Sequence, residues 1–135
     1  MVKINLNYQG DLRCSATHEP SGNQITTDAP VDNNGKGEAF SPTDLVATAL
    51  GACMGTVMGI VAERKGISLE GMSIEVRKHM SNTAPRRISK LEVDLNMPLP
   101  ANHPERKLLE STARGCPVHH SLHPDIEIAF IWRWS

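Results

Sequence analysis

The sequence predicts an α+β fold in which one long apolar helix separates two groups of short strands. Apolar and polar residues alternate between residues 2 and 8, which is the period of a half-buried strand. Similar alternation returns between residues 72 and 97 and again between 125 and 134. Between the first two blocks, residues 47 to 62 contain no charge, as expected of a buried helix. The expected element order is β-β-β-α-β-β-α-α-β.

The N-terminal part should form three short strands joined by turns. Residues 9–11 (Gln-Gly-Asp) read as a turn after the first strand, and a second strand is expected from Leu12 to His18. The turn at residues 20–23 (Pro-Ser-Gly-Asn) leads to a third strand over residues 24–28. Residues 30–38 are rich in glycine and asparagine and are expected to form a mobile loop.

The long helix has clear start and stop signals. Ser41 suits the N-cap, Pro42 the first helical position, and Asp44 can bond back to the cap. Gly66 suits the left-handed residue that follows a helix ending near Lys65. The sequence therefore predicts one helix of about six turns.

Small residues follow one stripe of this helix at four-residue spacing. Ala47, Gly51, Gly55 and Gly59 share the stripe, which predicts close approach of another element, most simply a second helix. The uncharged stretch is shorter than the roughly 20 residues that a bilayer span needs, so we expect a buried helix. Because so small a chain cannot cover this helix on both sides, we expect a homodimer with a shared core.

The C-terminal half should contain a hairpin, two helices and a last strand. Residues 72–80 and 90–97 alternate in character and are expected to pair as antiparallel strands with one wet face. A helix is expected from His103 to its closing Gly115, and a short helical turn from Cys116 to about Leu122. The long helix is then expected to pack on an antiparallel sheet.

Composition favours a single domain over residues 1–135 and argues against charged partners. The hydrophobic fraction is 39%, and the formal net charge is -1 with no basic run longer than Arg86-Arg87. Nucleic acid or an anionic membrane surface would need a basic stripe, so we expect neither as a partner. Three cysteines without a secretory signal at the N-terminus favour the reducing cytoplasm over a disulfide framework.

Two of the cysteines are candidates for thiol chemistry. Cys116 precedes Pro117 at a helix start, where unpaired backbone N–H groups favour a thiolate. Cys53 lies within the long helix and would need a cation brought in by the fold, from Arg13 or from Arg86 and Arg87 in the hairpin turn. Simple burial is the alternative for both thiols. Cys14, on the second strand, is interpreted as a packing residue.

Two motifs give the chain a resemblance to the OsmC/Ohr family. Residues 41–45 (Ser-Pro-Thr-Asp-Leu) leading to residues 49–54 (Ala-Leu-Gly-Ala-Cys-Met) resemble the central-helix motif of that family. Residues 116–119 (Cys-Pro-Val-His) resemble its second cysteine motif. The order of strands and helices also matches, so the resemblance covers nearly the whole chain.

The resemblance implies an intertwined homodimer, in which a cysteine pair at the subunit interface reduces organic hydroperoxides in oxidative-stress defence. Cys53 would be the thiolate that attacks the peroxide, and Cys116 would be the thiol that resolves the sulfenic acid as a disulfide. An external dithiol would restore the pair, and no cofactor would be needed. The activating arginine of the family comes from the N-terminal strands, where Arg13 is the one arginine.

One departure from the family pattern bears on activity. Peroxidase members carry a glutamate just after the proline at the helix start, where it holds the arginine. This chain has Thr43 there, followed by Asp44, and Glu38 in the preceding loop is a candidate stand-in. The chain therefore resembles the OsmC-like branch, whose substrates are less defined. A non-catalytic protein that binds a small apolar or thiol-bearing ligand is the alternative function.

A metal site is a second, weaker alternative near the C-terminus. Cys116, His119, His120 and His123 lie within eight residues and include metal-ligand types. Two prolines bracket the segment and no second ligand cluster is evident, so we expect surface or capping histidines and no metal.

Overall fold

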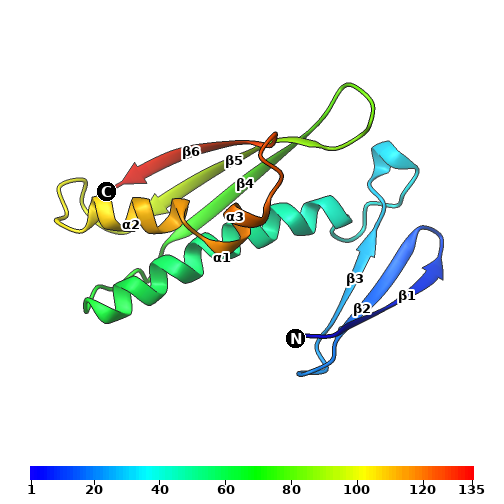
Figure 1. Ribbon diagram of the computed structural model, residues 1–135, viewed down its shortest axis with the longest axis horizontal. Coiled ribbons are helices and arrows are strands. Elements are labelled where there is room, and N and C mark those ends of the chain that lie inside the picture. The colour runs from blue at the N-terminus through cyan, green and yellow to red at the C-terminus, as the bar shows by residue number, and fades with distance from the viewer. The chain divides into compact units, whose positions relative to one another are not determined.

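The computed structural model describes residues 1–135, which form two compact units, Met1–Val46 and Ala47–Ser135. The predicted element order is confirmed, with one short 3₁₀ turn added (Figure 1). The elements in chain order are β1 (Ile4–Gly10), β2 (Arg13–His18), β3 (Gln24–Asp28), η1 (Val31–Asn33), α1 (Pro42–Arg64), β4 (Ser73–Met80), β5 (Ile88–Met97), α2 (Arg106–Arg114), α3 (Pro117–Ser121) and β6 (Glu127–Trp134).

The first unit contains an antiparallel sheet in the order β1-β2-β3. Its register places Arg13 opposite Asp28 at one end of the β2–β3 pair. The predicted loop that follows contains η1 and folds back on Ala29, because a Cβ added to Gly35 would lie 1.7 Å from the carbonyl oxygen of Ala29. Glycine is therefore required at this position for the backbone to approach so closely.

Both ends of α1 follow from local chemistry, as the sequence predicts. The backbone N–H of Asp44 donates to Ser41 Oγ at 3.0 Å, and the N–H of Ser41 donates to Asp44 Oδ2 at 2.9 Å. These two bonds form a capping box that satisfies donors otherwise left free at the helix start. At the other end, Gly66 has a φ of 67°, the left-handed conformation that ends many helices.

The second unit contains a three-stranded sheet in the order β4-β5-β6. The predicted antiparallel hairpin β4–β5 is confirmed. However, β6 pairs with β5 in parallel, so the sheet is mixed where the sequence predicts an antiparallel one. The reason is that α2 and α3 carry the chain back to the start of β5 before β6 begins, which is the crossover that a parallel neighbour requires.

The core of the second unit lies between this sheet and the three helices, which cover one face of it (Figure 1). Helix α1 contributes Leu50, Met54 and Met58, which have no exposed surface. They meet the apolar face of β5, where Leu91, Val93 and Leu95 are equally inaccessible. Alternation along β5 therefore directs its apolar side chains toward the helices.

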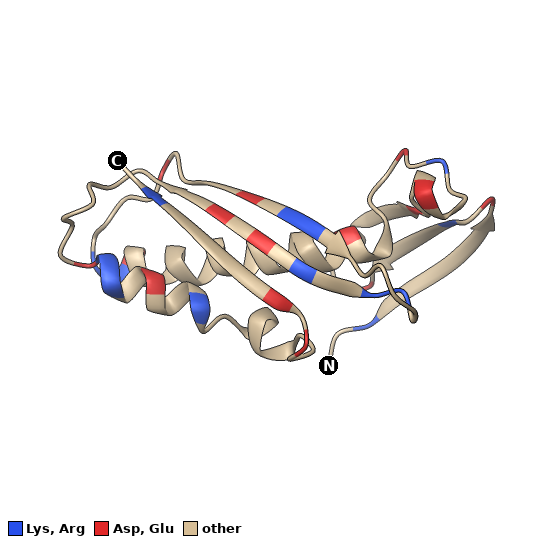
Figure 2. Ribbon diagram, turned by 90° about the horizontal axis from the view of Figure 1, so that it is seen from above, with Lys and Arg blue, Asp and Glu red and all other residues tan.

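All three strands of this sheet carry charged residues (Figure 2). On β5, Glu92 and Asp94 alternate with the core residues and therefore lie on the face opposite the helices. Asp94 on β5 is 6% exposed and accepts hydrogen bonds from Arg133 on β6, between 2.9 and 3.1 Å long. The Arg133 guanidinium lowers the pKa of Asp94, and hydrogen bonds from His79 and Arg77 lower the pKa of Glu92 to about 2. These carboxylates are therefore ionised at neutral pH, and the arginines that bond them offset their negative charge.

The glycine stripe of α1 was expected to meet a second helix. Within the chain, it meets strand β4 instead. A Cβ added to Gly51 would lie 2.9 Å from Val76 Cγ2, and one added to Gly55 would lie 3.3 Å from Ile74 Cδ1. Both neighbours are β4 side chains, so the absence of a Cβ lets β-branched residues reach the helix. Gly59 has nothing within 4 Å of such a Cβ.

The expectation of a buried α1 is wrong for the chain taken alone. The helix has 23 residues and is long and apolar enough to cross a membrane by length and composition, yet only 33% of its most apolar window is buried. Ala52, Thr56 and Ile60 lie on an exposed face, with Ile60 45% exposed. The Thr56 hydroxyl donates to the Ala52 carbonyl oxygen at 2.8 Å, so its polarity is satisfied within the helix. We call Ala52, Thr56 and Ile60 the open face of α1.

The contact between Gly51 and Val76 generates a stability prediction. Gly51→Ala should gain roughly 1 kcal/mol of helix propensity but lose about 1–3 kcal/mol through overpacking against Val76, whose χ1 is stiff. We therefore expect a net loss of about 1 kcal/mol in the free energy of unfolding, measured by urea denaturation at fixed protein concentration.

The matched control is the same substitution in a Val76→Ala background. There the crowding methyl is absent, so Gly51→Ala should be neutral or stabilising. Equal losses in the two backgrounds would show that another cause destabilises the variant.

Candidate functional site

The fold of residues 47–135 brings together the two cysteines that the sequence singles out. Cys53 lies in the middle of α1 and is half-buried, while Cys116 immediately precedes α3 and has no exposed surface. Cys53 packs against the cluster of buried residues that includes Cys116, and it raises the pKa of the Cys116 thiol. The two thiols are therefore near enough to influence one another, as a pair that closes a disulfide must be.

Packing of the helices into one core places both sulfurs. Cys53 is adjacent to Met54, which α1 buries against the sheet, so the thiol sits at the margin of the buried face. On the other side, α2 buries Leu109 and Ala113 in the same core. Gly115 then ends α2, and the chain enters α3 with Cys116 directed inward. Apolar burial thus brings the two cysteines into one core.

Cys116 is an N-cap residue, as predicted, but its thiol is not acidified overall. Its Sγ accepts a hydrogen bond from the backbone N–H of His119 at 3.4 Å, and its carbonyl oxygen accepts from the N–H of His120 at 3.2 Å. Burial nevertheless raises the pKa of the Cys116 thiol, and Cys53 raises it further, against the lowering effect of the His119 N–H. The expectation that the helix start favours its thiolate is therefore wrong, because desolvation outweighs the cap.

Arg13, the predicted activating arginine, is held by two carboxylates in the first unit. Its Nε donates to Asp28 Oδ1 at 2.7 Å and its Nη2 to Asp28 Oδ2 at 2.9 Å. Nη2 also donates to Glu38 Oε2 at 3.0 Å. Asp28 is 1% exposed, and hydrogen bonds from Arg13 lower its pKa, while the two carboxylates raise the pKa of the arginine. The guanidinium is thus permanently charged and fixed in orientation.

Glu38 therefore forms the bond to Arg13 that the resemblance implies for a glutamate of the family. Asp44 is engaged elsewhere, since its carboxylate accepts the Ser41 N–H in the capping box, and Thr43 Oγ1 lies 3.3 Å from Ser41 Oγ. The first unit thus assigns Thr43 and Asp44 to the helix start and Glu38 to the arginine. The structure brings Cys53 together with Cys116 and, separately, Arg13 together with Glu38.

Asp28 is the partner of Arg13 that our sequence reasoning missed. The predicted turn at residues 20–23 is close to the signal that finds it, but its position is one residue too far along the chain. That turn alone would pair the strands symmetrically about residues 20–23 and place Pro30 opposite Arg13. In the observed register Thr17 pairs with Gln24, so the strands pair about residues 20 and 21 and Asp28 lies opposite Arg13. A carboxylate facing an arginine at the end of two paired strands predicts an ion pair.

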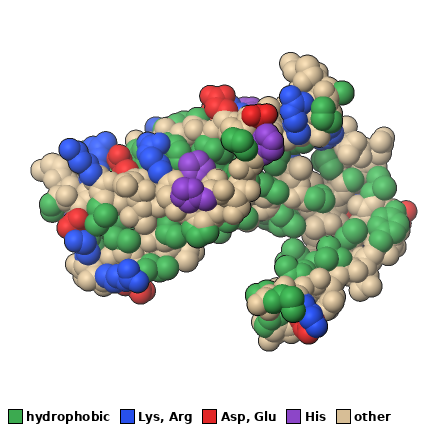
Figure 3. Space-filling model, in the orientation of Figure 1, with side chains coloured by type: hydrophobic (Ala, Val, Ile, Leu, Met, Phe, Trp, Pro, Cys, Tyr) green, Lys and Arg blue, Asp and Glu red, His purple; other side chains and the backbone are tan.

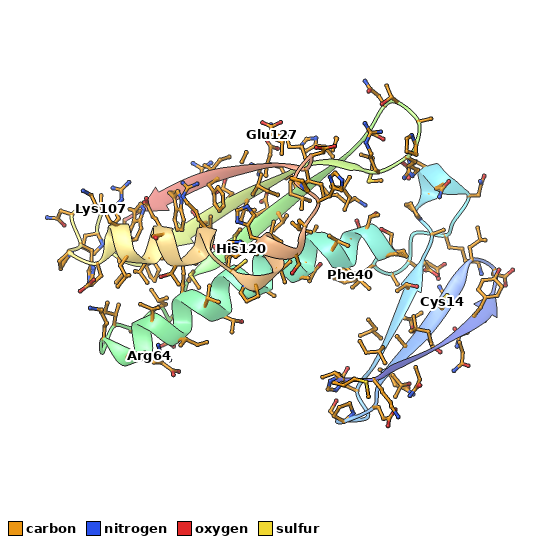
Figure 4. The ribbon with its side chains drawn as sticks, viewed as in Figure 1. Cys14, Phe40, Arg64, Lys107, His120 and Glu127 are labelled. Carbon is orange, nitrogen blue, oxygen red and sulfur yellow. The ribbon has the colours of Figure 1, made fainter.

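The remaining candidates have structural contacts. His119 Nδ1 bonds the carbonyl oxygen of Arg114, His123 Nδ1 accepts the N–H of Asp125, and His120 projects from α3 (Figure 4). Residues 1–135 contain no group of three or more His, Cys, Asp or Glu side chains arranged to hold a metal ion. Cys14 lies on β2 opposite Tyr8 and Thr27 and is half-buried.

Comparison with known proteins identifies the family. The profile of the OsmC-like protein family matches residues 35–130. A crystal structure from Psychrobacter arcticus 273-4, of a protein provisionally named an osmotic stress induced and detoxification response protein, is 47% identical and has a TM-score of 0.92. The alignment covers 98% of this chain and 96% of that one. No match was found among curated proteins.

More distant structures share the fold. The organic hydroperoxide resistance protein OsmC of Legionella pneumophila is 17% identical with a TM-score of 0.78, over 98% of this chain and 96% of that one. A provisionally named organic hydroperoxide resistance protein of Vibrio cholerae, with captopril bound in one active site, is 15% identical with a TM-score of 0.77, over 98% and 90%. From the profile match and the 47% identical relative, the chain belongs to the OsmC-like protein family.

Proposed function

We propose that this protein is a thiol peroxidase that reduces organic hydroperoxides, with Cys53 as the attacking thiol and Cys116 as the resolving thiol. The observation that carries the proposal is that one core holds a half-buried and a fully buried cysteine, near enough for Cys53 to raise the pKa of Cys116. The distant relative from Legionella, named for organic hydroperoxide resistance, adds support to this reaction class.

The chemistry uses both thiols in turn. The Cys53 thiolate attacks the terminal oxygen of the hydroperoxide, so that an S–O bond forms, the O–O bond breaks, and the leaving alkoxide takes up a proton. The Cys116 thiolate then attacks the sulfenic sulfur of Cys53, the S–S bond forms, and hydroxide leaves as water after protonation. An external dithiol reduces the disulfide by thiol exchange and returns both cysteines to the thiol state.

An aliphatic and methionine-rich setting favours organic over hydrogen peroxide as substrate. The core in which both cysteines take part is made of Leu, Val, Ala and Met side chains, with Leu50, Met54 and Met58 closest in sequence to Cys53. An alkyl tail loses water-exposed area on entering such surroundings, whereas hydrogen peroxide has no tail to bury. We place this activity in a compartment that keeps thiols reduced, the cytoplasm.

The cysteine roles generate the main activity prediction. Cys53→Ser should reduce oxidation of dithiothreitol by cumene hydroperoxide to the uncatalysed rate, because no attacking sulfur remains. Cys116→Ser should permit one turnover and leave a sulfenic acid on Cys53, detected as a dimedone adduct by mass spectrometry.

Cys14→Ser is the matched control, because Cys14 lies on β2 and takes no part in the proposed reaction. It should retain wild-type turnover. The assignment is rejected if Cys53→Ser turns over at the wild-type rate.

Arg13 is proposed to supply the positive charge that activates Cys53, with Asp28 and Glu38 as its orienting partners. The guanidinium is fixed at Nε and Nη2 by the two carboxylates, and its Nη1 makes no hydrogen bond. A fixed donor with one free nitrogen could bond a thiolate at low entropic cost. Glu38 is 66% exposed, so we expect it to contribute less to this orientation than the buried Asp28.

The proposed role of Arg13 can be tested in a variant that retains Cys53 as its only thiol. Arg13→Gln should slow alkylation of Cys53 by iodoacetamide at neutral pH by about tenfold or more, as one unit of thiol acidity corresponds to tenfold in thiolate. Glu38→Gln should slow it less, and Arg86→Gln, in the hairpin turn, should leave it unchanged. An unaltered rate in Arg13→Gln would remove Arg13 from the mechanism.

A homodimer is proposed as the functional assembly, supported by apolar surfaces that each unit leaves uncovered. On the sheet of the first unit, Ile4, Leu6 and Tyr8 lie on one face of β1 and are between 58% and 66% exposed, and hydrophobic side chains line this sheet in Figure 3. In the second unit the open face of α1 is also uncovered. Surfaces of this kind are typical of interfaces.

Sedimentation equilibrium should therefore give a mass of twice 14.8 kDa for the wild type. Leu6→Asp should shift the protein toward the monomer or to an unfolded chain, because a carboxylate cannot be buried in an apolar interface at low cost. Asn7→Asp, which adds the same charge on the other face of β1, should leave the dimer intact. A monomeric wild type would reject the assembly.

The alternative function is a non-catalytic ligand-binding protein. It is supported by the raised pKa of the buried Cys116, because a raised pKa leaves less of the thiolate that would close the disulfide. The distant relative from Vibrio cholerae holds captopril, a thiol-bearing molecule, in one active site. If the wild type shows no peroxide turnover while calorimetry detects binding of captopril, ligand binding is the better assignment.

A further inference from the structure

The side chain of His119 is fixed from two directions beside the thiol pair. Its Nδ1 bonds the carbonyl oxygen of Arg114, the last residue of α2. Because a carbonyl only accepts, Nδ1 carries the proton of the neutral ring. The ring also meets Phe130 edge to face, with centroids 6.0 Å apart and an interplanar angle of 83°. The Arg114 guanidinium lies 4.2 Å from the centre of that same Phe130 ring.

The backbone of the same residue contacts the reacting sulfur. The N–H of His119 donates to Cys116 Sγ, which lies in a largely apolar core beside the Cys53 thiol. The imidazole therefore ties α3 to the end of α2 across Gly115, and the N–H three residues after Cys116 is held against its sulfur. A substitution of His119 can therefore change the environment of Cys116 Sγ, although the imidazole ring does not bond that sulfur.

We propose that His119 is a positioning residue for Cys116: by bonding the Arg114 carbonyl it keeps its own backbone N–H on Cys116 Sγ, and so sets how readily Cys116 becomes the thiolate that closes the disulfide. This inference rests on the proposed function, in which Cys116 attacks the sulfenic sulfur of Cys53. Its physical basis is that a buried thiolate has few sources of stabilisation, so each well-held donor has a large effect. The Val118 N–H also lowers the pKa of Cys116, but the His119 N–H lowers it more.

The chain offers both a conservative variant and a matched control. His119→Asn keeps a side-chain N–H donor near the position of Nδ1, whereas His119→Ala removes it. His120 is the neighbouring histidine, its side chain is exposed and forms no hydrogen bond, and its ring lies 6.1 Å from that of His119. His120→Ala therefore controls for loss of an imidazole on the same turn.

The first experiment uses protein in which Cys116 is the only thiol, made by Cys14→Ser and Cys53→Ser. The alkylation rate of Cys116 is followed against pH. We expect His119→Ala to move the midpoint of the profile upward by about one pH unit, which slows the reaction about tenfold below the midpoint. His119→Asn should restore the midpoint, and His120→Ala should not move it.

The midpoint of the pH profile of alkylation distinguishes a positioning role of His119 from a merely structural one. A loosened α3 would let reagent reach the sulfur and raise the plateau at high pH without moving the midpoint upward. An unchanged midpoint in His119→Ala, a failure of His119→Asn to restore it, or an equal shift in His120→Ala would each overturn the proposal.

A second experiment distinguishes this inference from the proposed function. In the protein with both reacting cysteines, stopped-flow mixing with cumene hydroperoxide should show formation of the Cys53 sulfenic acid at the wild-type rate in His119→Ala. Disulfide closure should then be about tenfold slower. No sulfenic acid in the wild type would reject the peroxidase itself, whereas normal closure in His119→Ala would reject only the role of His119.

Discussion

The packing of one face of α1 against β5 is the constraint on which the second unit depends. Leu50, Met54 and Met58 lose all contact with water there, and each such side chain is worth about 1.5–3 kcal/mol on full burial. This face fixes the rotation of the helix about its axis, so Cys53 must lie at its margin. α2 joins the same core through Leu109 and delivers Cys116 beside it. The proximity of the two thiols is a by-product of hydrocarbon packing.

Elements whose ends are set by neighbouring residues could be predicted from the sequence. The boundaries of α1 follow from the Ser41 and Asp44 capping box and from the left-handed Gly66, all local effects. The parallel placement of β6 could not be predicted in this way, because alternation along a strand does not encode the direction of its neighbour. The same holds for the glycine stripe: the sequence indicates that something approaches Gly51, but the identity of Val76 as that neighbour depends on the folded sheet.

In the candidate site, too, residue types could be predicted from the sequence, whereas properties that depend on the folded structure could not. The two cysteines and Arg13 are recognisable from residue type and position, and Glu38 from the family pattern. The acidity of Cys116 was mispredicted, because the cap is visible in the sequence while the depth of burial is not. Asp28 was overlooked because the strands pair about residues 20 and 21, one residue before the centre of the predicted turn. Burial and cross-strand partnership are collective properties, and a displacement of the turn by one residue changes every cross-strand pair.

The Arg13 cluster has an electrostatic consequence for the kind of molecule it can attract. One guanidinium between two carboxylates leaves the group of Arg13, Asp28 and Glu38 with one negative charge in total. Lys36, which is near enough to lower the pKa of Asp28, offsets that charge. Beyond a screening length of about 8 Å in physiological salt, an approaching solute therefore experiences little field of either sign. The positive charge of Arg13 acts at touching distance, on the Nη1 edge. Such an arrangement does not concentrate anions such as carboxylates and phosphates, while uncharged oxidants can approach without opposition.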